Sequence, residues 1–200
     1  MVRKISGSAR EGCALRTLGE SVTRLGSILL SLSISSAVTL ICKSSIDFGT
    51  NYIEVNVFDR EKIFIDRVLT PLVDDFSELK IVLEHISTKE AVDFILNASD
   101  NLAATITPQH VLLNRSDFFD VSFQPHNYCL PVLKEEHDRL AVLGAATSGN
   151  SKFFLGTDSA PHPRSKKESG CGCAGIFSAY NALGIYAEIF DEQNKLDKLE

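Results

Sequence analysis

The stretch FFLGTDSAPH, residues 153–162, decides the fold because it joins an apolar run to a polar loop with chemically active side chains. The apolar run predicts a short buried strand that ends at Gly156. The loop beyond it carries Asp158 and His162. In α/β folds, catalytic residues collect at the carboxyl ends of strands, so this loop is a candidate active-site loop. The alternative is a polar turn in which Asp158 caps the turn and His162 is solvated.

Strand and helix patterns alternate along the chain before and after this stretch. Residues 79–85 predict a strand that ends in His85, and the capping box of residues 87–90 predicts the helix after it. Residues 102–107 predict another strand, with an exit loop at 108–110, and helical patterns cover residues 132–146 and 176–190. Upstream, apolar residues at helical spacing predict a helix from about residue 58 to 72, with residues 59–62, Glu61 among them, on its polar side and a kink or last turn at Pro71.

This alternation predicts an α/β fold with a parallel sheet covered by helices. The chain supplies only about three or four βα units. A closed barrel needs eight such units and about 250 residues. We therefore expect part of such a barrel.

The composition is that of an ordinary globular protein. Hydrophobic residues make up 44% of the 200 residues, enough for one domain or part of a larger one. The net charge of −6 and the pI near 5.4 argue against nucleic-acid binding as the main function. The five cysteines are scattered and form no CxxC pair, which favours reduced thiols in an intracellular compartment.

Residues 1–54 differ in character from residues 55–200, and we treat them as an atypical leader. Residues 1–45 are basic, rich in serine and poor in acidic residues, and an uncharged apolar run covers residues 25–42. Three interpretations stay open: a transit peptide, a membrane or signal segment, and sequence unrelated to the domain that follows. We expect the protein in the cytoplasm, or in a mitochondrion or plastid if the leader is a transit peptide.

His85 and Asp158 form a candidate metal site, because each follows a strand and parallel strands end at one rim. A histidine and a carboxylate from different strand ends supply half of a zinc site. Zinc would lower the pKa of a bound water, and Asp158 would take the proton as hydroxide attacks a carbonyl. The competing interpretation of His85 is a hydrogen-bonded structural histidine.

A basic loop follows Asp158 and would suit an anionic substrate. Its members are His162, Arg164, Lys166 and Lys167. On composition alone, the arginine and the two lysines are equally well explained as a solvated loop. The histidines elsewhere are interpreted as structural or solvated; they are His110, His126 and His137.

Several motifs, taken in order, resemble a known enzyme family. They are LEHISTK at 83–89, ATITPQH at 104–110, PHNYCLP at 125–131, GTDSAPH at 156–162 and KESGCGCAG at 167–175. Together they resemble dihydroorotase of the shorter, monofunctional type, in the amidohydrolase superfamily. The resemblance runs from about residue 55 to residue 200.

The resemblance implies a partial TIM-type barrel and, in a complete site, two zinc ions. It implies reversible hydrolysis of L-dihydroorotate to N-carbamoyl-L-aspartate in pyrimidine biosynthesis. It also implies that His85 is a ligand of the second zinc, and that Asp158 is a ligand of the first zinc and the general base. His162 and the backbone of Ala174 would contact the substrate carboxylate, and the backbone of Leu130 would contact the ring. The expected partners are this small-molecule substrate and a second copy in a homodimer, with no nucleic acid.

The chain also departs from the pattern of the family it resembles. It contains no His-x-His pair for the first zinc, and no strand matches the one that carries the family's metal-bridging lysine. Because zinc sites use three or four protein ligands, we expect this chain alone to bind zinc poorly and to show no appreciable dihydroorotase activity. Two explanations stay open: a partial sequence of a working enzyme, or a truncated non-catalytic remnant or module that pairs with a full-length homologue.

Overall fold

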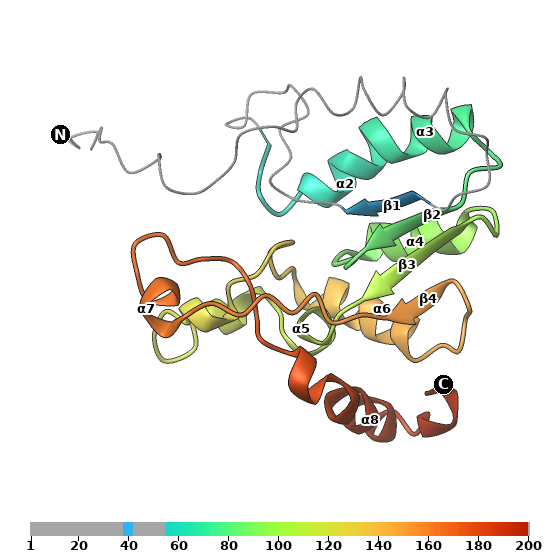
Figure 1. The fold of residues 1–200 in the computed structure, drawn as a ribbon. Helices are drawn as coiled ribbons and strands as arrows, with labels where there is room; N and C mark the ends of the chain where they lie inside the picture. Colours follow the sequence, from blue (N-terminus) through green and yellow to red (C-terminus); the bar gives the residue numbers. More distant parts are fainter. Residues whose placement is uncertain (1–37, 42–54, 200) are drawn as a thin grey trace.

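The structure, a computed structural model, describes residues 38–41 and 55–199. Within these ranges one parallel sheet has the strand order β1-β2-β3-β4 (Figure 1). Its strands are β1 (Val38–Ile41), β2 (Ile81–Glu84), β3 (Leu102–Ile106) and β4 (Phe153–Leu155). The last three confirm the predicted strands. Strand β1 lies within residues 1–54, the segment predicted to be a leader, and the other residues of that segment fall outside the described ranges.

The helix before β2 consists of three consecutive segments. They are α2 (Arg60–Phe64), the π-helical turn η1 (Ile65–Leu69) and α3 (Thr70–Asp75). Pro71 lies in the first turn of α3. Proline lacks an N–H and clashes with the carbonyl four residues earlier, and the wider π turn just before Pro71 accommodates both effects. The kink predicted at Pro71 therefore takes the form of a π-helical turn.

The other helical elements connect or follow the strands. They are α4 (Lys89–Asn97), α5 (Pro108–Leu112), η2 (Arg115–Phe118), η3 (Pro125–Asn127), α6 (Glu136–Ala146), α7 (Arg164–Lys167), η4 (Ala179–Asn181), α8 (Ala182–Glu192) and η5 (Leu196–Lys198). Helix α4 begins as predicted, although its cap is Thr88, whose side chain accepts a hydrogen bond from the Ala91 N–H at 3.1 Å. Helices α6 and α8 begin later than the predicted residues 132 and 176.

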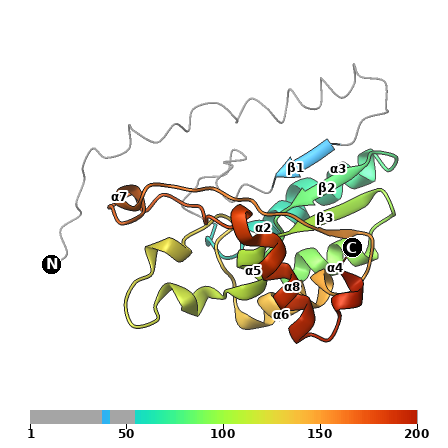
Figure 2. The same ribbon diagram turned by 60° about the horizontal axis from the view of Figure 1, so that its bottom comes forward.

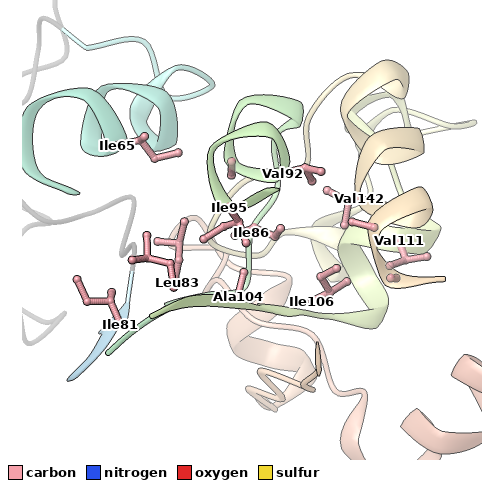
Figure 3. Packing of buried hydrophobic residues seen from close by; sticks show 14 of the residues in the cluster. Ile65, Ile81, Leu83, Ile86, Val92, Ile95, Ala104, Ile106, Val111 and Val142 are labelled. Carbon is pink, nitrogen blue, oxygen red and sulfur yellow. The ribbon is translucent and has the colours of Figure 1, made fainter. Parts of the chain in front are cut away.

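The hydrophobic core lies between one face of the sheet and the helices that cover it (Figure 3). Alternate residues of the strands point to this face, as the pleat requires, and Leu83 and Ile106 are fully buried there. They meet Ile95 of α4 and Val142 of α6, which are equally buried. This core fixes the strand ends from which the site is built. None of the helices in the described ranges is long and apolar enough to cross a membrane.

Candidate active site

The structure places His85 and Asp158 at the same edge of the sheet. His85 directly follows β2, and Asp158 lies in the loop after β4. Because the strands are parallel and β3 lies between these two, their carboxyl ends share one edge. The loop that carries α7 and the segment that carries η2 and η3 extend beyond that edge in both views (Figures 1 and 2). The site is therefore built from strand ends and two long connections.

Both residues have a left-handed backbone. The φ angle is +47° at His85 and +40° at Asp158. Non-glycine residues seldom adopt this conformation, and each instance costs about 1–3 kcal/mol. Such strain collects at functional sites, where it aims a side chain that a regular strand would direct elsewhere.

His85 is buried, with 6% of its surface exposed. The backbone N–H of His85 donates a hydrogen bond to Thr105 Oγ1 at 2.6 Å, and the Thr105 hydroxyl donates to Glu84 Oε2 at 2.6 Å. The ring Nδ1 is also buried but has no hydrogen-bond partner. A buried unpaired polar atom costs about 1–3 kcal/mol, and native proteins rarely leave one without a use. The histidine thus has a ring nitrogen suited to an external ligand.

The residues after His85 are held by a buried network of opposite charges. Glu61 of α2, with 1% of its surface exposed, accepts hydrogen bonds from the Ser87 N–H at 2.9 and 3.1 Å and from the Ser87 hydroxyl. Lys134 Nζ donates to Ser87 Oγ at 3.0 Å and to the Val132 carbonyl at 2.8 Å. The sequence assigned Glu61 to the polar side of its helix, so its burial was missed. Only its partner 26 residues away reveals it.

Asp158 is exposed at the edge of the site and acts electrostatically on Cys129. Burial, with a smaller contribution from the negative charge of Asp158, raises the pKa of the Cys129 thiol to about 12. The thiol therefore stays protonated near neutral pH, and a protonated thiol is a poor nucleophile. Among these two side chains, the carboxylate is the group that can take up a proton.

His110 is structural, in agreement with one of its two interpretations. Its Nδ1 accepts a hydrogen bond from the Thr107 hydroxyl at 2.7 Å, and its Nε2 donates to the Pro131 carbonyl at 2.9 Å. The tautomer is assigned from these partners, because a carbonyl can only accept. Burial lowers the pKa of His110 to about 3, so the ring is neutral. It anchors the segment that contains Leu130 and its cis peptide bond to Pro131.

The structure brings together His162, Ala174 and the segment around Leu130. His162 Nε2 donates a hydrogen bond to the Ala174 carbonyl at 3.0 Å. The next residue, Gly175, donates its N–H to the Tyr128 carbonyl at 2.9 Å. Three of the residues predicted to contact substrate therefore lie on two connected loops beside Asp158.

The interpretation as a solvated basic loop is wrong for Lys167. This residue is 3% exposed, and its Nζ donates hydrogen bonds at 2.9 Å to the carbonyls of Tyr128, Cys173 and Gly175. Arg164 and Lys166 are exposed, as that interpretation requires. Composition does not distinguish Lys167 from Lys166, so the burial of Lys167 could not be predicted from composition.

Zinc is the metal that the resemblance implies, and the donor types of His85 and Asp158 suit it. The unpaired Nδ1 of His85 is the observation that fits a metal ligand. Within the part of the chain that the structure describes, no three His, Cys, Asp or Glu side chains gather into a metal site. A complete zinc site would need further ligands beyond these two.

Curated proteins named dihydroorotase match this chain closely. The protein from Nitrosomonas europaea is 61% identical over 146 residues, which are 73% of this chain and 42% of the relative. The Arabidopsis thaliana protein named "Dihydroorotase, mitochondrial" is 60% identical over 147 residues, which are 73% of this chain and 39% of the relative. The chain thus spans about 40% of the length of these relatives. No family model matches the chain.

Solved structures give the same result. Dihydroorotase from Saccharomyces cerevisiae, solved with 5-fluoroorotic acid, has a TM-score of 0.67 and 37% identity over 72% of this chain and 41% of that one. An L-hydantoinase from Arthrobacter aurescens has a TM-score of 0.57 at 19% identity over 72% of this chain and 33% of its own, so it supports the fold alone. The predicted α/β fold, as part of a TIM-type barrel, is confirmed. The C-terminal portion of the chain therefore belongs to the dihydroorotase family, and it corresponds to less than half the length of its relatives.

Proposed function

We propose that residues 55–200 supply one part of a zinc-dependent dihydroorotase site, which interconverts L-dihydroorotate and N-carbamoyl-L-aspartate. The observation that carries the proposal is the pair of left-handed residues, His85 after β2 and Asp158 after β4, at one edge of the sheet, together with the unpaired Nδ1 of His85. The identity to proteins named dihydroorotase supports this choice of reaction over other cyclic-amide hydrolyses.

In this proposal His85 and Asp158 hold zinc, which when bound polarises the amide carbonyl and lowers the pKa of water. Asp158 also acts as the general base. Its carboxylate takes the proton from the attacking water and delivers it to the ring nitrogen as the C–N bond breaks. The exposed position of Asp158 allows this transfer, and its strained backbone aims the carboxylate. The hydrogen-bonded backbone of His85 keeps its ring in place.

The two connected loops bind the substrate. His162 and the backbone at Ala174 contact the substrate carboxylate, and the backbone at Leu130 contacts the ring. The hydrogen bond between His162 and Ala174 supports a shared role, because it fixes the imidazole against the loop. Hydrogen bonds from an imidazole N–H and from fixed backbone N–H groups suit a carboxylate.

We further propose that the 200-residue chain is inactive alone, because His85 and Asp158 are two of the three or four ligands that zinc requires. The activity is best tested in a hybrid protein. In it, the 146 matched residues replace their counterparts in the Nitrosomonas europaea protein. We expect the hybrid to hydrolyse dihydroorotate, and we expect the isolated chain to neither retain zinc stoichiometrically nor turn over.

Variants of the hybrid test the assigned roles. Asp158→Ala is expected to lower kcat by about 10²–10⁴-fold, the contribution typical of a general base. His85→Ala is expected to lower both activity and zinc content. Lys166→Ala is the control, because this side chain is exposed and outside the site. An inactive hybrid that folds and binds zinc, or an unchanged kcat in Asp158→Ala, would contradict the proposed function.

A second candidate function is that of a non-catalytic module that pairs with a second copy or with a full-length homologue. Exposed apolar side chains at the start of α8 favour it. Tyr180 is 78% exposed and stacks on Phe177 at 5.1 Å, and Leu183 is 75% exposed. Such clusters are typical of interfaces. Analytical ultracentrifugation of the chain is expected to show a dimer that Leu183→Lys disrupts, and a monomer at all concentrations would count against pairing.

We propose a cytoplasmic location, with a mitochondrion or plastid as the alternative if residues 1–54 act as a transit peptide. A relative named as mitochondrial supports the alternative. A fluorescent protein fused after residue 54 distinguishes them: organellar import supports a transit peptide, and diffuse fluorescence supports the cytoplasm.

A further inference from the structure

Lys167 is a buried lysine whose hydrogen bonds are all made to backbone carbonyls. Its ammonium group has three N–H donors, and its three acceptors are the carbonyls of Tyr128, Cys173 and Gly175, each at 2.9 Å. The Nζ also lies 5.9 Å from the centre of the Tyr128 ring. The donor capacity of the ammonium is therefore fully used.

The acceptors belong to two segments that are far apart in sequence. Tyr128 is 39 residues before Lys167 and precedes Cys129 and Leu130. Cys173 and Gly175 flank Ala174 on both sides. One side chain thus bonds to both segments from which the proposed function takes its backbone contacts to substrate. The hydrogen bond from Gly175 N–H to the Tyr128 carbonyl adds a direct link between them.

The charge of this lysine is not explained by an ion pair. In residues 55–199, no carboxylate lies within ion-pair distance of its Nζ. Burial lowers the pKa of Lys167. Burying an ammonium group carries a large desolvation cost. A neutral side chain would fill the same space without that cost, so the three carbonyl bonds account for the charge.

We propose that Lys167 is a positioning residue that couples the Leu130 segment to the Ala174 segment and thereby sets the distance between the two backbone contacts to the substrate. The coupling itself is a property of the folded chain. Its consequence for substrate rests on the proposed function. Lys167 touches neither substrate nor metal in this assignment, and it acts through the two segments it bonds.

The first test uses the full 200-residue chain and needs no substrate. Hydrogen exchange is compared between the wild type, Lys167→Met and the control Lys166→Met, whose side chain is exposed in the same short helix. In Lys167→Met, protection of the Gly175 amide is expected to fall by about tenfold or more, and exchange in both segments is expected to rise together. Protection in β2 and β3 is expected to stay unchanged. Unchanged protection at Gly175 overturns the proposal, as does a loss confined to one segment.

The second test protects the proposal against a variant that fails to fold. In the wild-type chain, NMR is expected to detect a slowly exchanging Lys167 ammonium with scalar couplings to the carbonyl carbons of Tyr128, Cys173 and Gly175. An ammonium that exchanges as fast as those of exposed lysines overturns the proposal whatever the variant does.

The third test separates this proposal from the proposed function. In the hybrid, Lys167→Met is expected to raise KM for dihydroorotate by about tenfold, with kcat within about threefold of the parent. Lys166→Met is expected to change neither. An equal KM in Lys167→Met overturns the consequence for substrate. If the hybrid is inactive while Gly175 loses protection in the chain, the proposed function fails and the coupling stands.

Discussion

Gly175 lies in direct contact with Ala160, and no side chain fits between them. A Cβ atom at Gly175 would lie 2.4 Å from the Ala160 carbonyl oxygen, and the φ angle of Gly175 is +144°. We expect Gly175→Ala to lower the free energy of unfolding by about 1–3 kcal/mol or more, through overpacking and backbone strain. Urea denaturation of the chain measures this change.

Gly144 provides the matched control for that substitution. It lies inside α6, and a Cβ atom there would meet nothing within 4 Å. Gly144→Ala is expected to stabilise the protein by about 0.5–1 kcal/mol, because alanine loses less conformational entropy in a helix. Equal effects of the two substitutions would contradict the close approach at Gly175.

Glu61 is expected to be important for stability because its carboxylate is buried and hydrogen-bonded to Ser87. Glu61→Gln replaces the two carboxylate oxygens that accept hydrogen bonds from Ser87 with one amide oxygen and an NH2 group that cannot accept. We expect a loss of about 2–4 kcal/mol in the free energy of unfolding. The control is Glu90→Gln, because Glu90 is exposed and lies 3.7 Å from Lys62, a pair worth less than about 1 kcal/mol. A comparable loss in both variants would argue against a special role for the buried network.

The neutral state of His110 makes the protein less stable in acid. Burial lowers the pKa of His110 from 6.5 to about 3. Between these values the unfolded chain binds a proton that the folded chain does not. The contribution is therefore complete above about pH 6.5 and is lost as the pH falls toward 3. We expect His110 to add about 1.4 kcal/mol per pH unit to the slope of the unfolding free energy between pH 6 and 5.

His110→Gln is expected to remove that part of the slope, as measured by urea denaturation at several pH values. His137→Gln is the control, because the His137 side chain is 62% exposed. A slope that is the same in the wild type and in His110→Gln would show that the ring is protonated in the folded state.

Asp158 allows catalysis and stability to be separated. Asparagine has nearly the same shape and tolerates a left-handed backbone, so Asp158→Asn is expected to abolish activity of the hybrid without loss of stability. A β-branched residue does not tolerate this backbone, so Asp158→Val is expected to lose activity and also about 1–3 kcal/mol of stability. Thermal denaturation compares the two variants, and equal melting temperatures would argue against the strained backbone.

Strands β2, β3 and β4 could be predicted from sequence because each is an apolar run between turn signals, whereas β1 was not predicted because it lies in the segment interpreted as a leader. The start of α6 could not, since Val132 and Leu133 are buried in an extended segment and imitate the first turn of a helix. The helix begins one turn later, where the side chains of Glu135 and Asp138 form its capping box.

From residue type and position alone, candidate site residues could be proposed only where they follow strands. His85 and Asp158 do so, and they could be proposed from position and residue type. Lys134 and Lys167 could not be found, because the burial of a lysine depends on acceptors supplied by distant parts of the chain. For the same reason, the role of Glu61 was hidden by its place on the polar side of a helix.

The left-handed backbone at His85 and Asp158 also limits how this sequence can diverge. A duplicated copy released from selection for chemistry can lose the imidazole and the carboxylate with little strain only by changing to asparagine or glycine. Other replacements would weaken the scaffold as well. Among paralogues of this chain, histidine and aspartate at these two positions therefore indicate a site that is still under selection for catalysis. Asparagine or glycine at both positions indicates an intact fold that has lost the catalytic site.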